Sequence, residues 1–193
     1  MKKETNSNNE KLVNKVFEIL TKFKENPKNF ENIFTELFEK DFEAQLIEIS
    51  KLKTGLLKGT FNFDTSGNGG NAFKLALYTS ISSYSTASTV YLAGTGNGEV
   101  SSSGTSYTAG GNALTNSGVS VSSNIAFIDF SDLTFPSVTL TAAGAAIYKT
   151  TGGGNELVMV LDFGGNKTAT NGDFVIQFPT NDSSNAILRI GNA

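Results

Sequence analysis

The sequence of 193 residues contains no cysteine, no histidine and no tryptophan. Without cysteine and histidine, the chain cannot build the zinc, haem, iron–sulfur or blue-copper sites that depend on those ligands. The same absences exclude a Ser-His-Asp triad, a Cys-His dyad and any histidine base. Any chemistry would therefore rest on carboxylates, lysine, serine, threonine or tyrosine. Disulfides are excluded too, so burial or partners must stabilise the fold.

Charge and long apolar runs are also scarce. Residues 1–58 hold 11 lysines and 10 acids, a net charge of +1, while residues 59–193 hold 4 basic residues and 8 acids, a net charge of −4. Neither part has the basic patch that nucleic acid requires. The longest weakly apolar run, LTAAGAAIY, is far shorter than the roughly 20 residues of a membrane helix, and the polar start does not predict a secretory signal. We expect a soluble protein made in a cytoplasm, with neither nucleic acid nor membrane as a partner.

Residues 1–56 have the apolar spacing of a helical segment, with two or three helices. Apolar side chains recur every three or four residues, first from Leu12 to Phe23 and then from Phe30 onward. The second stripe is wide and rich in phenylalanine. Either it folds on the first helix as a hairpin, or part of it docks on another chain, because two helices have little interior of their own. The docking interpretation predicts a protein interface at Phe30, Phe34, Leu37, Phe38 and Phe42.

After Gly59 the apolar period changes from about 3.6 to 2, which predicts β-strands. Eight runs are separated by Gly, Ser, Asn and Asp clusters, and no helical pattern interrupts them, so the sheets are expected to be mostly antiparallel. The predicted fold class is α+β, with a helical anchor or oligomerisation segment at 1–56 and a jelly-roll-like antiparallel β-sandwich at 57–193. The runs are KGTFNFD, FKLALY, GVSVS, IAFIDF, VTLTAAGAAIYK, LVMVLDF, DFVIQF and AILRI, and a further short strand within YTAGGNALT stays open.

The stretch LVMVLDFGGNKTATNGDFVIQFP, at 157–179, raises the question of a site in its Gly- and Asn-rich middle. Carboxylates that met at one edge of a sandwich could hold Ca²⁺ or form a glycosidase pair. The stretch matches no calcium motif, however, and Asp and Asn before Gly are ordinary turn formers. We therefore interpret it as a turn between two strands, and predict no catalytic residue, no metal ligand and no cofactor. The acids considered are Asp129, Asp132, Asp162, Asp173 and Asp182.

Five strings, YTAGGNALT, VTLTAAGAAIY, LVMVLDFGGNKT, GDFVIQFP and NAILRI, together resemble a small virion-protein domain of tailed bacteriophages. The resemblance covers about residues 73–190 and leaves residues 1–56 outside. The chain departs from it at Ala143, where related sequences tend to carry Arg, and at Phe135, where they tend to carry Trp. None of the strings is an enzymatic signature, so the resemblance implies a structural component of a phage particle.

This resemblance leads to the expected function, a non-enzymatic capsid decoration (cement) or head-fibre subunit at the surface of the virion. Its expected partners are other virion proteins, above all the major capsid protein, and further copies of itself, with a trimer favoured. The alternative is a tail protein that binds a receptor or glycan through a cleft whose mouth would carry Tyr78, Tyr84, Tyr91 and Tyr107.

Overall fold

The computed structural model describes residues 52–85 and 87–191. The helices predicted for residues 1–51, and the predicted interface residues Phe30, Phe34, Leu37, Phe38 and Phe42, lie outside this part of the chain. Within it, no helix is both long enough and apolar enough to cross a membrane.

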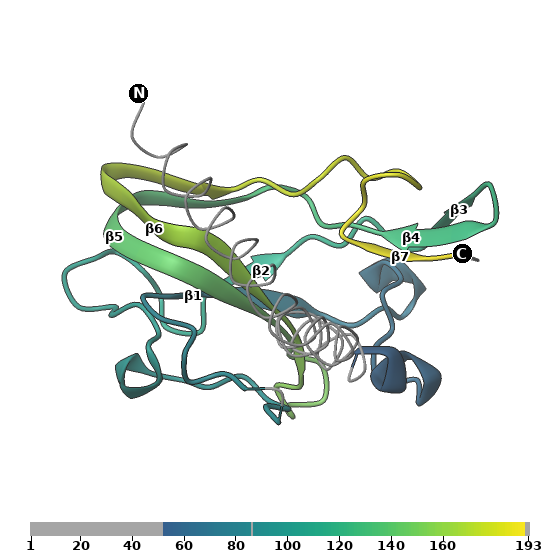
Figure 1. The fold of residues 1–193 in the computed structure, drawn as a ribbon, viewed down its shortest axis with the longest axis horizontal. Coiled ribbons are helices and arrows are strands. Elements are labelled where there is room, and N and C mark those ends of the chain that lie inside the picture. Colours follow the sequence, from purple (N-terminus) through teal and green to yellow (C-terminus); the bar gives the residue numbers. More distant parts are fainter. Residues whose placement is uncertain (1–51, 86, 192–193) are drawn as a thin grey trace, which may run out of the picture. The chain divides into compact units, whose positions relative to one another are not determined.

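A four-stranded antiparallel sheet forms the larger part of the fold, in the order β2-β1-β5-β6 (Figure 1). Its strands are β1 (Phe73–Tyr78), β2 (Asn112–Leu114), β5 (Leu133–Lys149) and β6 (Leu157–Ile176). β5 and β6 form one long hairpin. Along β5, only the second half pairs with β1, from Phe73 opposite Lys149 to Tyr78 opposite Gly144. The first half of β5 therefore continues with β6 as a two-stranded ribbon.

A smaller antiparallel sheet has the order β3-β4-β7. It consists of β3 (Ser120–Ser122), β4 (Ile125–Ile128) and β7 (Leu188–Ile190). The two sheets share one core, because Phe130, just after β4, lies edge-on to Phe73 at 5.8 Å between ring centroids. Phe73 also stacks on Phe63 at 4.8 Å.

The centre of the larger sheet is buried on both faces. Leu75, Leu77 and Ile147 point into the main core, and their neighbours Ala76 and Tyr78 point to the opposite face. This alternation follows from the two-residue period of a strand. A sheet that is covered on both sides needs a second layer on each face, and on the Tyr78 face that layer comes from the long connection between β1 and β2.

The predicted turn inside 157–179 is wrong, because the whole stretch from Leu157 to Ile176 belongs to β6. The Gly- and Asn-rich middle forms bulges instead. Asp162 pairs with Gly144, and Lys167 pairs with Ala142. Between these two pairs β6 has four residues and β5 has only one. A bulge adds extra residues to one strand without ending the strand pairing. The Gly and Asn residues, which usually mark a turn, therefore bend one continuous strand in this protein.

The predicted fold class is also wrong. Instead of an α+β fold with an N-terminal segment of two or three helices and a jelly-roll-like sandwich, the described residues form two antiparallel sheets. They contain one short helix, at 52–57, and the 3-10 helices η3 (Ser66–Asn68) and η4 (Thr95–Asn97). Two predicted strands merge into β6, which leaves too few strands for a jelly roll. Leu52 of the short helix is buried in the main core. The predicted domain boundary between residues 56 and 57 stays a prediction.

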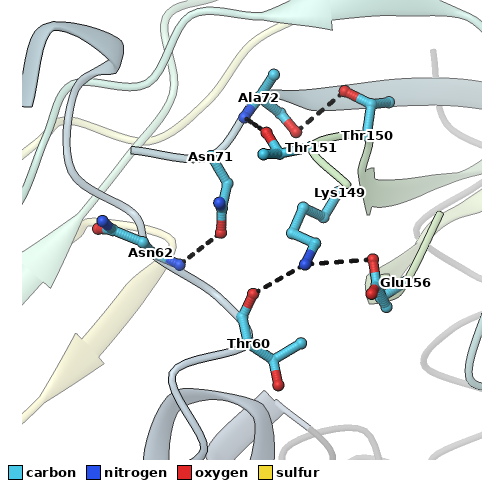
Figure 2. Close-up of polar contacts among 8 residues, drawn as sticks. All are labelled: Thr60, Asn62, Asn71, Ala72, Lys149, Thr150, Thr151 and Glu156. Carbon is cyan, nitrogen blue, oxygen red and sulfur yellow. Dashed lines mark hydrogen bonds and ion pairs between the residues drawn. The ribbon is translucent and has the colours of Figure 1, made fainter. Parts of the chain in front are cut away.

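The run KGTFNFD, predicted as a strand, lies outside both sheets, and its first two residues form a turn. Side-chain contacts hold it against the β5–β6 hairpin and against the residues just before β1 (Figure 2). Lys149 Nζ donates to the carbonyl of Thr60 at 3.1 Å and lies 3.4 Å from a carboxylate oxygen of Glu156. The Asn62 amide N–H donates to Asn71 Oδ1 at 2.7 Å. These contacts supply partners that a neighbouring strand would otherwise provide.

Candidate functional site

The most elaborate polar arrangement in the described residues surrounds Glu99, which is only 2% exposed. Glu99 forms an isolated antiparallel bridge with Tyr78 at the end of β1. Directly opposed residues of such a pair point to the same face. The bridge therefore places the Glu99 carboxylate on the Tyr78 face of the larger sheet.

Four donors converge on this carboxylate. One oxygen accepts from the Tyr91 hydroxyl and the Gly94 amide, both at 2.7 Å. The other accepts from the Tyr107 hydroxyl at 3.0 Å and the Gly110 amide at 2.6 Å. A buried carboxylate is costly unless its oxygens are hydrogen-bonded, and these four bonds satisfy both of them.

All five tyrosines of the chain belong to this arrangement, which we call the tyrosine cluster: Glu99 with Tyr78, Tyr84, Tyr91, Tyr107 and Tyr148. The hydroxyls of Tyr78 and Tyr84 are 2.7 Å apart, and Tyr78 donates to the Leu92 carbonyl at 2.7 Å. The Tyr91 and Tyr148 rings stack at 4.3 Å.

The cluster orders a connection that has little regular structure of its own. Tyr91 and Gly94 belong to one part of the β1–β2 connection, and Tyr107 and Gly110 to another, and all four meet at Glu99. Gly98, next to Glu99, has φ of +88°, and a Cβ there would lie 2.3 Å from the Ser80 carbonyl oxygen. Close backbone approach therefore requires glycine at this position. The cluster holds the connection as a fixed layer on the sheet.

Burial raises the pKa of every tyrosine in the cluster above its ordinary value. For Tyr148, burial and then the negative charge of Glu99 raise the pKa to about 12. For Tyr91, the hydrogen bond to Glu99 adds to the effect of burial. The neutral phenol is the stable form in the folded chain, so these hydroxyls serve as hydrogen-bond donors rather than as bases.

These pKa shifts predict alkaline unfolding. Each folded-state pKa is raised above the unfolded value of about 10, so the stabilisation is complete below pH 10 and is lost as the pH rises above it. We expect the five tyrosines to ionise together as the chain unfolds. Ultraviolet absorbance of tyrosinate and near-ultraviolet circular dichroism, followed in one titration, would measure this. Ionisation near pH 10 with the native dichroism retained would contradict it.

The four tyrosines predicted for a cleft mouth do come together, but their hydroxyls are used inside the cluster. Tyr78 and Tyr107 are buried, and Tyr84 and Tyr91 are half-buried. The Tyr107 hydroxyl also accepts from the Leu77 amide at 3.1 Å, in addition to its bond to Glu99. These contacts fit a structural role better than they fit a ligand-binding mouth.

Within the described residues, no three of the acids considered for calcium or glycoside hydrolysis gather as a metal site would need. Each accepts a main-chain N–H instead. Buried Asp129 accepts from the amides of Phe130 and Ile187, and burial raises its pKa. The other acceptors are Asp132 from Phe178, Asp162 from Gly164, Asp173 from Ser137, and Asp182 from Ser184 and Asn185.

Sequence reasoning missed Glu99, although a signal was present. Glu99 is the only charged residue between Lys74 and Asp129. A single acid in a long run of Gly, Ser, Thr and Asn is more informative than one acid among many, because it has no nearby cation to pair with on the surface. Tyrosines at 91 and 107, on either side of it, supply two of the four donors.

An apolar groove of about 200 Å³ lies between the short helix, residues 61–63 and the smaller sheet. Val121, Ala126 and Ile190 stand opposite one another across β3, β4 and β7. Val121 is 70% exposed and Ile190 55% exposed. The apolar face of this sheet therefore runs from the core out to the surface at both edge strands.

Comparison with known proteins gives no relative: no family model, no curated protein and no solved structure matches the chain.

Proposed function

We propose that this chain is a non-enzymatic virion structural protein, a capsid decoration or head-fibre subunit of a tailed phage. The strings that resemble such proteins lie in the strands that frame the fold. VTLTAAGAAIY falls in β5, LVMVLDFGGNKT falls in β6, and NAILRI contains β7. The resemblance thus concerns the scaffold of the β-domain, which suits a protein whose task is structural.

The observation that carries the proposal is the use of the acidic side chains. Every one of the eight acids between residues 59 and 191 accepts a hydrogen bond or forms an ion pair inside the domain. Such contacts stabilise a fold, which is the role that acids have in a structural protein. Here the carboxylates hold chain segments in place. They are Asp64, Glu99, Asp129, Asp132, Glu156, Asp162, Asp173 and Asp182.

The proposed partners are the major capsid protein and sister subunits, with a trimer favoured. Exposed apolar surface marks association sites on soluble proteins, and the apolar row from Val121 to Ile190 provides such a surface. We assign particle attachment to the segment 1–56, on the strength of its Phe-rich stripe. The proposed location is the outer capsid surface, after synthesis in the host cytoplasm.

Copy number in the purified particle tests this proposal. A decoration protein follows the symmetry of the shell, so we expect on the order of hundreds of copies per particle. Quantitative mass spectrometry against the major capsid protein would measure the ratio. A handful of copies would favour the alternative, a tail protein that binds a receptor or glycan, and absence from the particle would refute both.

A further inference from the structure

The bulges of β6 create a second feature, a hollow of about 490 Å³ along this strand. The first bulge begins where Asp162 Oδ1 accepts from the Gly164 amide at 2.8 Å. Gly164 and Gly165 have φ of +67° and +138°, values that side chains other than glycine rarely adopt. The bulge brings Phe163 near Phe174, at 6.3 Å between ring centroids. The hollow is therefore built into the strand by its hydrogen bonds and glycines.

The lining of the hollow combines apolar walls with polar groups of several kinds. Phe163, Val175 and Ile176 supply apolar surface, Phe174 is only 7% exposed, and Lys167 and Gln177 are exposed beside them. Four of the eight lining residues are polar, so the hollow offers hydrogen-bonding groups beside apolar surface, as a ligand with one polar and one apolar face requires.

Two opposite charges line the same hollow, Lys167 and Asp173. The only ion pair found in residues 52–85 and 87–191 joins Lys149 to Glu156, so neither charge is neutralised by a salt bridge there. Asp173 accepts from the Ser137 amide through Oδ1 alone, which leaves Oδ2 for another donor. The hollow thus offers one cationic donor and one anionic acceptor, and the charges of these two side chains sum to zero.

We propose that this hollow binds a neutral pyranose ring of a glycan. A pyranose has an apolar C–H face that fits an aromatic wall and hydroxyls that both donate and accept. Asp173 accepts from one hydroxyl and Lys167 donates to another. A charged sugar gains less, because one of the two side chains repels it. The site lies on β6 and shares no residue with the tyrosine cluster.

Saturation-transfer difference NMR on the full chain tests the proposal with defined sugars. The neutral probes are methyl glucopyranoside, methyl galactopyranoside and N-acetylglucosamine, and the charged probes are glucosamine and N-acetylneuraminic acid. We expect at least one neutral probe to bind with a Kd in the millimolar range and more tightly than either charged probe. No signal from any neutral probe, or tighter binding of a charged one, would overturn the proposal.

Substitutions locate the binding. Lys167→Ala removes an exposed side chain, and Asp173→Asn keeps an acceptor oxygen for the Ser137 amide, so neither should disturb the core. Each is expected to weaken binding about tenfold, the effect of losing a hydrogen bond to a charged group. Thr170→Ala, on the same strand but outside the hollow, is the matched control and should change the Kd less than about twofold. Equal binding by all three variants would show that the site lies elsewhere. None of these outcomes depends on the copy number in the particle.

Discussion

Replacing Glu99 by alanine is expected to lower the free energy of unfolding by at least about 3 kcal/mol, because each buried donor left without a partner costs about 1–3 kcal/mol. Four donors lose their acceptor in this variant, from Tyr91, Gly94, Tyr107 and Gly110. Water that enters the vacated space satisfies some of these donors. The total loss of stability is therefore smaller than the sum of the costs of four unsatisfied donors. A typical domain is stable by only about 5–15 kcal/mol, so this is a large fraction.

Glu99→Gln should be intermediate, at about 2 kcal/mol. The amide keeps the shape of the side chain but turns one acceptor oxygen into a donor. A tyrosine hydroxyl can rotate to accept, whereas the backbone amide of Gly94 or Gly110 cannot. The order expected is therefore wild type, then Glu99→Gln, then Glu99→Ala.

Urea unfolding measures these differences well in this chain. With no tryptophan and all five tyrosines in the cluster, tyrosine fluorescence reports on the region that the substitution changes. Asp162→Ala is the matched control, since Asp162 is exposed and accepts one main-chain hydrogen bond; its expected cost is about 1 kcal/mol or less. If Glu99→Ala costs no more than this control, the cluster does not stabilise the domain.

The double substitution Phe34→Asp with Phe38→Asp is expected to remove the protein from the particle while the β-domain still folds. These phenylalanines are four residues apart in the Phe-rich stripe that predicts the interface. Truncating a buried phenylalanine costs about 3–5 kcal/mol, and a charge in its place adds a desolvation cost. Mass spectrometry of purified particles would measure the bound copies.

The matched control adds the same charge at polar positions nearby, Asn32→Asp with Thr35→Asp, and should leave attachment near the wild-type level. If Phe34 and Phe38 pack within the segment 1–56 instead, the double variant should destabilise that segment, which circular dichroism would measure. If the double variant occupies the particle at the normal level, the anchor lies in the β-domain and not in the segment 1–56.

Short apolar runs that end at ordinary turn residues are enough to predict β1, β4 and β7, although β1 is buried on both faces and β7 has no buried residue. The same reasoning failed at β6. Gly and Asn mark turns and bulges alike, and only the pairing of β5 with β6 decides between them. Local sequence does not contain that pairing.

The candidate site was less accessible to sequence reasoning than the strands. Glu99 and Tyr107 are eight residues apart, and Tyr148 comes from β5, much later in the chain. Their meeting depends on the way the β1–β2 connection covers the sheet. Sequence reasoning overlooked the isolation of Glu99 between Lys74 and Asp129, and that signal in any case does not identify the donors.

A cryo-electron microscopy reconstruction of the purified particle tests the central claim most directly. The proposal predicts density for the two-sheet β-domain at symmetric positions on the outer surface of the capsid. Density confined to the tail, or a capsid complete without this chain, would contradict it.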